Sequence, residues 1–375
     1  MSTATLPSLH AFLVLNALPH IGPVTLNRLL AELGGDPGAV LTAGRQRLER
    51  VKGVGPVIAA TIECWRDHFD LGRELERMGV AGADFITPGD PGYPRLLREI
   101  HDPPIGLYRK GRYEFTRPTV AIVGSRRTTL YGQAVARRFG AELGRLGFCV
   151  VSGLARGIDT AAHEGAIESG GATAAVLGAG IDIIYPPENL DLYRRIEAAG
   201  AVLSEFPFGR RADRQSFAMR NRIVAGMCEA TVVIESDVDG GAMITARFAG
   251  EYGRMIFAVP GRIDQATSAG CHQLIRDGAT LLTSVDDLLA EFSYLDGLRP
   301  PPIAEKPAAA GKPAGPDLTP EEARVVACFR GGAILGADAL VGLTGFGAAQ
   351  LAVVLLGLEL RRVLAKRADG AFELR

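Results

Sequence analysis

The segment FPFGRRADRQSFAMRNRIVAG, residues 206–226, combines cationic and aromatic side chains in a way that suits nucleic-acid binding. Its arginines are Arg210, Arg211, Arg214, Arg220 and Arg222, its aromatic residues are Phe206, Phe208 and Phe217, and its one acid is Asp213. Guanidinium groups bind phosphate through paired hydrogen bonds, and an aromatic ring stacks on an unpaired base. Arginine supplies 36 of the 41 basic residues, which favours clusters, and some of these phenylalanines must be core. The pattern nevertheless favours an anion site over an ordinary surface.

Glycine-rich loops follow several short apolar runs, where they could also hold phosphate. In VAIVGSRRTTLYG, residues 120–132, Gly124 permits close backbone approach, Ser125 offers a hydroxyl group and Arg126 a guanidinium. The loops SGLARGIDTAAH (152–163), LGAGIDIIYPPEN (177–189) and ESDVDGGAMITA (235–246) follow other runs. The further candidate residues are Arg127, Ser152, Gly153, Arg156, Gly178, Gly180, Gly240, Gly241 and Thr245. Loops at the carboxyl ends of parallel strands share one sheet edge, so we expect these loops to line one cleft.

Cofactor-binding and catalytic motifs are absent from these loops. None reads G-x-G-x-x-G, no acidic residue ends the second apolar run, and no Walker sequence occurs, which disfavours a nicotinamide or flavin cofactor. Ser204-Glu205 is not a nucleophile elbow. Asp159 and His163 stand four residues apart and could form an acid–base pair or bind a metal, but no further ligands accompany them. We interpret the pair as structural and expect no cofactor, no metal and no catalytic site.

Charge and cysteine content restrict the class of protein. With 41 basic and 42 acidic residues among 375, the formal net charge is −1, so a polyanion must be held by a local patch. The five cysteines are scattered and never spaced as CxxC, which indicates reduced thiols and no zinc site. The apolar stretch 11–18 lacks a preceding basic region, and no apolar run reaches 18 residues. We therefore expect a cytoplasmic protein without a signal peptide or a membrane span.

Six nearly all-apolar runs, separated by polar sequence of helix length, predict the elements that position these loops. The runs are 120–124, 149–153, 173–178, 201–205, 231–235 and 255–260. Continuous apolar strands linked by helical crossovers are typical of a parallel sheet covered on both faces. We therefore predict an α/β core over residues 86–295, a doubly wound Rossmann-like parallel sheet. The proline-rich segment 86–117 is expected to pack onto it as an entry arm.

Residues 1–85 are predicted to form a helical domain. LPHIGPVTLNRLL (18–30) and VKGVGPVIAATI (51–62) each place a glycine-containing turn before a new helix, the pattern of a helix-hairpin-helix or SAM-like domain. The turn amides and the following helix N-terminus could hold a DNA phosphate. The same glycines also suit a plain helical hairpin, and the near balance of 8 basic and 9 acidic residues leaves both alternatives open.

The C-terminal end is predicted to form a winged helix after a linker. Residues 296–317 are rich in proline, alanine and glycine and lack periodicity, which is typical of a linker. Residues 318–375 then predict helices starting at Thr319 and spanning 337–343 and 347–360, followed by two strand-like runs around an Ala-Asp-Gly turn. Because LAVVLLGLEL is very apolar for a recognition helix, the module is either a DNA-binding winged helix or a protein–protein module.

With GSRRTTLYG, SGLARGIDTAAH, LGAGIDIIYPPEN, FAMRNRI and VPGR in this order, residues 86–292 resemble the DNA-processing protein A (DprA/Smf) family. The resemblance implies a protein that binds and protects single-stranded DNA during natural transformation and recombination. It also implies RecA recombinase as a partner that is loaded onto the strand, and homodimerisation through the Rossmann-like domain. The helical N-terminal domain and the winged-helix C-terminal domain agree with the variable ends of this family.

The DNA pocket of that family maps onto residues of this chain. The matches are Gly124, Ser125 and Arg126 for its Gly-Ser-Arg turn, Arg214 for a basic residue, Phe217 for its stacking aromatic, and Arg220, Asn221 and Arg222 for its Arg-Asn-Arg run. The chain departs from the family pattern in two places. It reads FAMRNR where FPxRNR is usual, and DGGAMIT where a Ser-Gly-Ser turn is usual, which removes hydroxyl donors from residues 240–245.

Two other functions are compatible with the sequence. Nucleoside-monophosphate phosphoribohydrolases of the lysine-decarboxylase-like group share a Rossmann-like fold and a GSR-type turn. They carry a PGGxGTxxE motif, however, whose glutamate is missing from DGGAMITA and PGRIDQATSAG. An assay for the release of adenine from AMP separates this hypothesis from DNA binding. The second alternative is a scaffold that only contacts RecA, which a gel-shift with oligo-dT would exclude.

Overall fold

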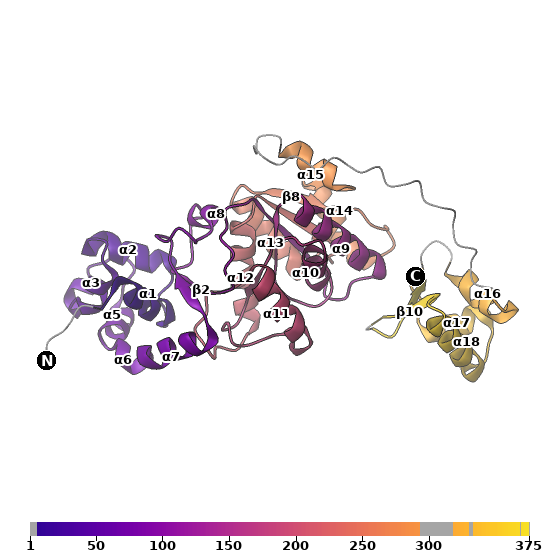
Figure 1. Cartoon of the computed structure of the whole chain (residues 1–375), viewed down its shortest axis with the longest axis horizontal. Coiled ribbons are helices and arrows are strands. Elements are labelled where there is room, and N and C mark those ends of the chain that lie inside the picture. The colour runs from indigo at the N-terminus through magenta and orange to yellow at the C-terminus, as the bar shows by residue number, and fades with distance from the viewer. Residues whose placement is uncertain (1–5, 293–317, 330–332, 368, 375) are drawn as a thin grey trace. The chain divides into compact units, whose positions relative to one another are not determined.

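The computed structural model describes residues 6–292, 318–329, 333–367 and 369–374. They form two compact units, which are described separately (Figure 1). The first contains the N-terminal helices and a central sheet, and the second contains the C-terminal helices, a hairpin and the short segment 127–132. The predicted linker, residues 296–317, lies outside the described residues.

The N-terminal helices pack around an apolar core of their own. They are α1 (Ser8–Ala17), α2 (Pro23–Leu33), α3 (Pro37–Thr42), α4 (Arg45–Leu48), α5 (Pro56–Glu63), α6 (Trp65–His68) and α7 (Leu71–Ala81). Both predicted turns precede a helix, because Gly22 is the N-cap of α2 and Gly55 is the N-cap of α5. A proline follows each glycine at the first position of the helix, where the backbone N–H that proline lacks would not be hydrogen-bonded within the helix.

A nine-stranded sheet forms the centre of the first unit. Its strands are β1 (Asp84–Ile86), β2 (Leu107–Lys110), β3 (Thr119–Gly124), β4 (Cys149–Ser152), β5 (Thr173–Leu177), β6 (Ala201–Ser204), β7 (Ala230–Ile234), β8 (Met255–Ala258) and β9 (Thr280–Leu281). The spatial order is β1-β2-β6-β5-β4-β3-β7-β8-β9. The six predicted strands are confirmed as β3 to β8, and every neighbouring pair among them is parallel.

The sheet is mostly parallel, as predicted, and the segment expected to pack as an entry arm supplies antiparallel strands at one edge. Strands β1 and β2 come from the arm and its margin, and β2 runs antiparallel to β6 with Tyr108 opposite Ser204. Strand β9, with two residues, also lies outside the predicted strands. Because β1 spans residues 84–86, the predicted domain boundary after residue 85 crosses a strand.

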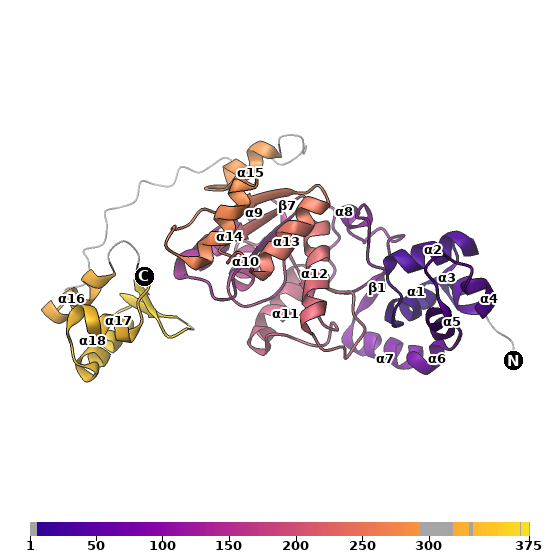
Figure 2. The ribbon, with the colours of Figure 1, turned by 180° about the vertical axis from the view of Figure 1, so that it is seen from behind.

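Helices cover both faces of the sheet, as Figures 1 and 2 show from opposite sides. One face carries α9 (Leu130–Arg145), α10 (Ile158–Glu168), α11 (Leu190–Ala199) and α15 (Val285–Glu291), and the other carries α8 (Arg95–Arg98), α12 (Arg214–Gly226), α13 (Gly241–Glu251) and α14 (Ala266–Arg276). Alternate strand residues enter opposite cores: Val120 and Ile122 pack on the α9–α10 side, and Ala121 and Val123 on the α12–α13 side. This two-sided burial explains why the strands are apolar throughout.

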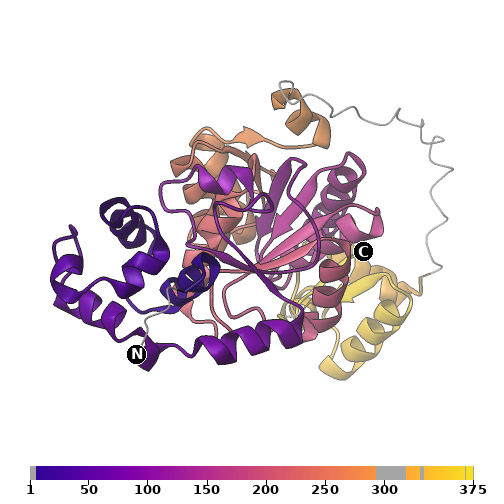
Figure 3. The same cartoon turned by 60° about the vertical axis from the view of Figure 1, so that its left-hand side comes forward.

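The strand order reverses at β3. The chain runs from β3 to β6 in one direction and returns to β7 on the other side of β3. Figure 3 shows the twisted strands of this sheet with helices on both sides. The loops after β3 and β7 therefore leave neighbouring strands toward opposite faces, which is the arrangement at which ligands of open α/β sheets bind.

The second unit confirms the three predicted C-terminal helices and the hairpin. Its elements are α16 (Pro320–Cys328), α17 (Ala337–Thr344), α18 (Ala348–Leu360), β10 (Leu364–Lys366) and β11 (Phe372–Leu374). The predicted N-cap, Thr319, forms a capping box in which its hydroxyl accepts from the N–H of Glu322 and the Glu322 carboxylate accepts from the N–H of Thr319. Among the described helices, none alone is long and apolar enough to span a membrane, and one bent pair, α17 with α18, meets that test of length and composition together.

Candidate nucleic-acid interface

Arg126, Phe217 and Tyr185 form a cluster beside the carboxyl ends of the parallel strands. The guanidinium carbon of Arg126 lies 5.0 Å from the centroid of the Phe217 ring. The Tyr185 ring lies 5.7 Å from the Phe217 ring and is inclined to it by 50°. Arg126 and Tyr185 are exposed, and Phe217 is half-buried. The cluster thus combines a cation with aromatic surface, the two groups that hold a phosphate and an unpaired base.

The backbone of Ser125 fixes the position of Arg126. Its N–H donates to the carbonyl oxygen of Glu235 after β7 (2.6 Å), and its carbonyl oxygen accepts from the N–H of Ile158 at the start of α10 (3.3 Å). Gly124 permits this packing, because a Cβ there would lie 1.9 Å from the carbonyl oxygen of Ile234. The loops after β3, β4 and β7 therefore meet at Ser125, and Arg126 and the neighbouring Arg127 are exposed beyond it.

The N-terminus of α12 holds Phe217 against the loop after β5. Asp213 caps this helix by accepting from the N–H of Ser216 (2.7 Å), and that bond lowers the pKa of the Asp213 carboxyl. The Ser216 hydroxyl donates to the carbonyl oxygen of Gly178 (2.6 Å), which ties the helix to the loop. A Cβ at position 178 would meet the Phe217 ring at 3.0 Å, so glycine allows the ring to lie directly on the backbone.

The predicted basic run divides into exposed and buried arginines. Its exposed members are Arg210, Arg211 and Arg214. Arg210 forms an ion pair with Asp213 (3.1 Å), whereas Arg214 is the first residue of α12, close to the phosphate-binding end of a helix. Of the aromatic residues, Phe206 and Phe208 are buried, so that Phe217 alone is placed to meet a base.

Arg222 belongs to a buried ion-pair network. Its Nη2 donates to Glu205 Oε1 (2.5 Å) and its Nε lies 3.3 Å from Asp102 Oδ2. Asp102 also accepts from the Tyr252 hydroxyl (2.8 Å). The predicted role of Arg222 as a phosphate ligand remains a prediction, but the structure places its guanidinium among carboxylates, where it joins α12 to the segment after β6.

Arg220 is buried as well, beneath the loop after β4. Its guanidinium donates to the carbonyl oxygen of Val176, and a Cβ at Gly153 would meet Nη1 at 1.9 Å. Burial lowers the pKa of Arg220 to about 10, so the side chain is still charged at neutral pH. The structure therefore explains the glycine at position 153 by the close approach of this arginine.

A carboxylate of the chain itself occupies the loop after β4. Asp159 Oδ2 accepts from the N–H groups of Gly153 (3.1 Å) and Ala155 (3.3 Å). The Ser152 hydroxyl donates to the carbonyl oxygen of Ile122 (2.6 Å). The Ser152 hydroxyl and the Gly153 N–H, which the sequence predicted to bind a phosphate, thus donate to acceptors within the protein.

His163 and Asp159 have structural partners, though not each other. His163 Nδ1 lies 2.7 Å from the Thr173 hydroxyl, which also donates to the carbonyl oxygen of Val150 (2.7 Å). Burial lowers the pKa of His163 to about 3, so the imidazole is neutral at neutral pH. Asp159 thus holds the loop after β4, and His163 contacts Thr173 at the start of β5. Both residues are structural, as predicted, but through separate contacts.

The loop after β7 is joined to α12. Asn221 Nδ2 donates to the carbonyl oxygen of Gly241 at the start of α13 (3.2 Å). Thr245 is buried, and a Cβ at Gly240 would meet the Ser236 hydroxyl at 2.4 Å. Gly240, Thr245 and Asn221 therefore take part in packing around this loop, whereas Gly241 is exposed with open space where a side chain would project.

Comparison with known proteins decides the family. The model of the family described as DNA recombination-mediator protein A matches residues 84–293, more than half of the chain. The chain belongs to this family. The DprA winged helix domain matches residues 307–370, which confirms the predicted C-terminal module. Protein Smf of Synechocystis sp. is 39% identical over 283 residues, which cover 73% of this chain and 70% of the relative.

Two solved structures of family members are similar to this chain. That of DNA processing protein A from Streptococcus pneumoniae has a TM-score of 0.66 at 32% identity and covers 76% of this chain and 98% of the other. That from Helicobacter pylori, described for its unique single-stranded DNA binding mode, has a TM-score of 0.51 at 28% identity and covers 56% of this chain and 96% of the other. These matches confirm the Rossmann-like α/β core.

Within this member of the family, the loop after β5 contributes a residue that the sequence analysis left out of the site. Tyr185 lies in the loop 177–189, and its ring is next to that of Phe217. An aromatic residue in a loop that directly follows a parallel strand is the sequence pattern that points to it. The predicted residues Gly180 and Arg156 have partners of their own. The N–H of Gly180 donates to the backbone carbonyl oxygen of Arg210, and the Arg156 guanidinium forms an ion pair with the Glu188 carboxylate.

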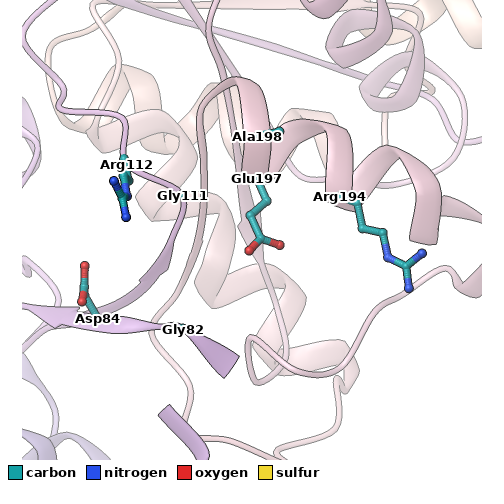
Figure 4. A pocket seen from close by; sticks show the side chains of 7 residues that line it. All are labelled: Gly82, Asp84, Gly111, Arg112, Arg194, Glu197 and Ala198. Carbon is teal, nitrogen blue, oxygen red and sulfur yellow. The ribbon is translucent and has the colours of Figure 1, made fainter. Parts of the chain in front are cut away.

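A separate hollow lies at the other end of the sheet of this DprA-family core (Figure 4). It has a volume of about 640 Å³ between α11 and the antiparallel pair β1 and β2, and it is lined by Gly82, Asp84, Gly111, Arg112, Arg194, Glu197 and Ala198. Its acids are already paired, Asp84 with Arg109 (3.1 Å) and Glu197 with Lys110 (3.0 Å). The glycine-rich loops do not line this hollow, so we place the candidate site at the Arg126–Phe217 cluster.

Proposed function

We propose that this chain binds single-stranded DNA at the Arg126–Phe217 cluster. The observation that carries the proposal is a guanidinium and an aromatic ring held together, 5.0 Å apart, where loops of the parallel strands converge. The likeness to the Helicobacter pylori structure, which is described as binding single-stranded DNA, supports the same ligand. A duplex keeps its bases stacked on each other, so only a single strand can offer a base to Phe217.

The proposed site uses exposed groups for charge and a half-buried ring for stacking. Arg126 and Arg214 are exposed cations that can neutralise phosphates. Phe217 supplies the stacking surface, and Gly124, Ser125 and Gly178 hold both parts in place. Because the acid–base candidates Asp159 and His163 are engaged in structural contacts, we propose that the protein acts by binding rather than by catalysis.

Replacing Arg126 by alanine is expected to weaken binding to oligo-dT and to flatten its salt dependence. One neutralised phosphate contributes about −0.7 to the slope of log affinity against log salt concentration on a single strand. The measurement is a salt series of binding to oligo-dT and to a duplex of the same length. Arg138→Ala is a matched control, because Arg138 also lies over a phenylalanine ring (5.1 Å) but on α9. An unchanged slope for Arg126→Ala would remove Arg126 from the phosphate site.

Family membership suggests a role for this chain beyond DNA binding itself. We infer that it protects incoming DNA in the cytoplasm during natural transformation and loads RecA recombinase onto the strand. Family membership supports this inference. The exposed apolar side chains of α18, Val353, Leu356 and Leu360, suit contact with a protein better than contact with DNA.

We further propose that the Rossmann-like core forms a homodimer through the β8–β9 end of the sheet. Strand β9 is the last strand in the sheet order, and Leu281 on it is 46% exposed. Ile263, in the loop after β8, is 95% exposed and offers apolar surface to a partner. An unpaired strand edge with apolar neighbours is a ready surface for a second copy.

Ile263→Glu is expected to convert the dimer into a monomer, because a buried unpaired carboxylate at an interface is strongly unfavourable. Light scattering after gel filtration measures the mass. Val80→Glu on α7 is the control, since Val80 is 87% exposed but lies on the N-terminal helices. A dimer that persists in Ile263→Glu would place the contact elsewhere.

A further inference from the structure

Tyr185 is an exposed aromatic residue that no step of the proposed function uses. Its side chain is 45% exposed, and its ring lies 5.7 Å from that of Phe217. A tyrosine ring offers an apolar face beside its polar hydroxyl, and an unpaired base can stack on such a face. The exposed Tyr185 ring thus lies beside the ring that we propose stacks on a base.

The backbone on both sides of Tyr185 is held in place. Pro186, which follows it, is buried, and Asn189 Nδ2 donates to the carbonyl oxygen of Leu154 (3.0 Å) and to the Thr160 hydroxyl (3.0 Å). Before it, the N–H of Ile183 donates to the carbonyl oxygen of Gly180 (2.8 Å). The ring is therefore presented by an ordered loop, which reduces the entropy lost when a ligand binds.

The two rings come from different elements and are brought together by Gly178. Phe217 is on α12, whereas Tyr185 is at the end of the loop that begins at Gly178. The absence of a Cβ at position 178 lets the Phe217 ring contact this loop, because a Cβ would meet the ring at 3.0 Å. The centroid separation of 5.7 Å lies within the range of about 4.5–7 Å typical of aromatic rings in direct contact, so no base fits between the two rings. Each ring can therefore receive a base only on surface that the other leaves free.

We propose that Tyr185 forms a second nucleobase subsite, so that the site stacks two unpaired bases, one on Phe217 and one on Tyr185. This inference rests on the proposed binding of single-stranded DNA. Tyr185 is 45% exposed, so part of its ring surface is open to a ligand. Stacking on an aromatic face tolerates any base, so the subsite takes an unpaired nucleobase without sequence preference.

The test compares two probes that differ only in their bases: oligo-dT and an abasic strand of the same length. In the full-length protein, Tyr185→Ala is expected to weaken binding to oligo-dT by roughly 5- to 150-fold, the loss for one stacked base. Its affinity for the abasic strand is expected to stay unchanged, because the phosphates are the same. Tyr185→Phe should bind both strands like the wild type. Leu190→Ala is the matched control, since Leu190 is 39% exposed and starts the helix after this loop.

Three results would overturn the subsite. Equal losses on both probes, or no loss on either, would show that Tyr185 does not stack on a base. The double variant Tyr185→Ala/Phe217→Ala should bind oligo-dT more weakly than either single variant, and a double variant no weaker than Phe217→Ala would mean that Tyr185 only supports the Phe217 ring. A wild-type protein that fails to bind oligo-dT would instead overturn the proposed function itself.

Discussion

Arg222→Ala is expected to destabilise the first unit by about 3–5 kcal/mol, because the change leaves a buried carboxylate without its partner. The Arg222 and Glu205 side chains are only 6% and 10% exposed, and they lie 2.5 Å apart. Asp102 would also lose its contact with Nε of Arg222 (3.3 Å). Urea unfolding followed by circular dichroism measures the free energy of unfolding.

Arg211→Ala is the control for this experiment. Arg211 belongs to the same basic run but is exposed, so its loss should change the free energy of unfolding by no more than about 0.5 kcal/mol. If Arg222→Ala were equally mild, the buried network would not contribute to stability as the geometry indicates. A shift in the unfolding midpoint without a change in the slope against urea would show that the loss is one of stability alone.

The double variant Arg222→Met/Glu205→Met separates the structural role of Arg222 from a role in DNA binding. Replacing both charges by apolar groups of similar volume removes the unpaired Glu205 carboxylate and is expected to cost much less stability than Arg222→Ala, while Asp102 keeps its hydrogen bond from the Tyr252 hydroxyl. If Arg222 is purely structural, the folded double variant should keep the wild-type salt slope with oligo-dT. A slope flattened by about 0.7 would instead assign Arg222 to a phosphate, as the family pocket implies.

Phe217→Ala is expected to weaken binding to oligo-dT by about 1–3 kcal/mol while leaving the salt slope unchanged. The reason is that a stacked base contributes no counterion release, whereas a neutralised phosphate does. Binding isotherms at several salt concentrations measure both quantities. The expected pattern is the opposite of that for Arg126→Ala, although the two side chains are in contact.

A matched control for Phe217→Ala is Phe248→Ala on α13. Phe248 is also half-buried, with the Arg247 guanidinium 5.6 Å from its ring and the Tyr252 ring 6.0 Å away. It should therefore lose similar packing without losing a base contact. If Phe217→Ala lowered the melting temperature more than Phe248→Ala and bound DNA normally when folded, Phe217 would be a core residue and not a stacking residue.

The core strands and the C-terminal helices were predictable because their patterns are local. A run of apolar residues followed by glycine marks a strand buried on both faces, and the six predicted strands correspond to β3 to β8. The Thr319–Glu322 capping box likewise lies within one helical turn. Strands β1, β2 and β9 have only three, four and two residues, and they become strands by pairing with neighbours distant in sequence, so no local pattern marks them.

The glycine-rich loops and the basic run of the site can be recognised from the sequence alone. Which of the arginines face solvent depends on the fold. Arg214 and Arg220 stand six residues apart on one helix, but α12 packs with Arg220 toward β5 and leaves Arg214 exposed. The apolar residues Ile223 and Val224 of this helix, and Met227 at its C-cap, are buried. Their spacing indicates which side of the helix is buried and so gives part of the difference between Arg214 and Arg220.

The loop after β4 shows why polar loops are hard to interpret from sequence. Its glycine and amides matched a phosphate site equally well, but in the folded chain they surround Asp159, a carboxylate from the same segment. Tyr185 and Phe217 show the reverse case, because 32 residues separate them in sequence and their rings meet only in the folded protein. The sequence thus shows which cations, aromatic rings and glycines the chain contains. The packing of α12 and of the loops against the sheet determines which of these groups contact each other and which remain open to a ligand. The reason is that burial and hydrogen bonding depend on neighbours that only the fold brings together.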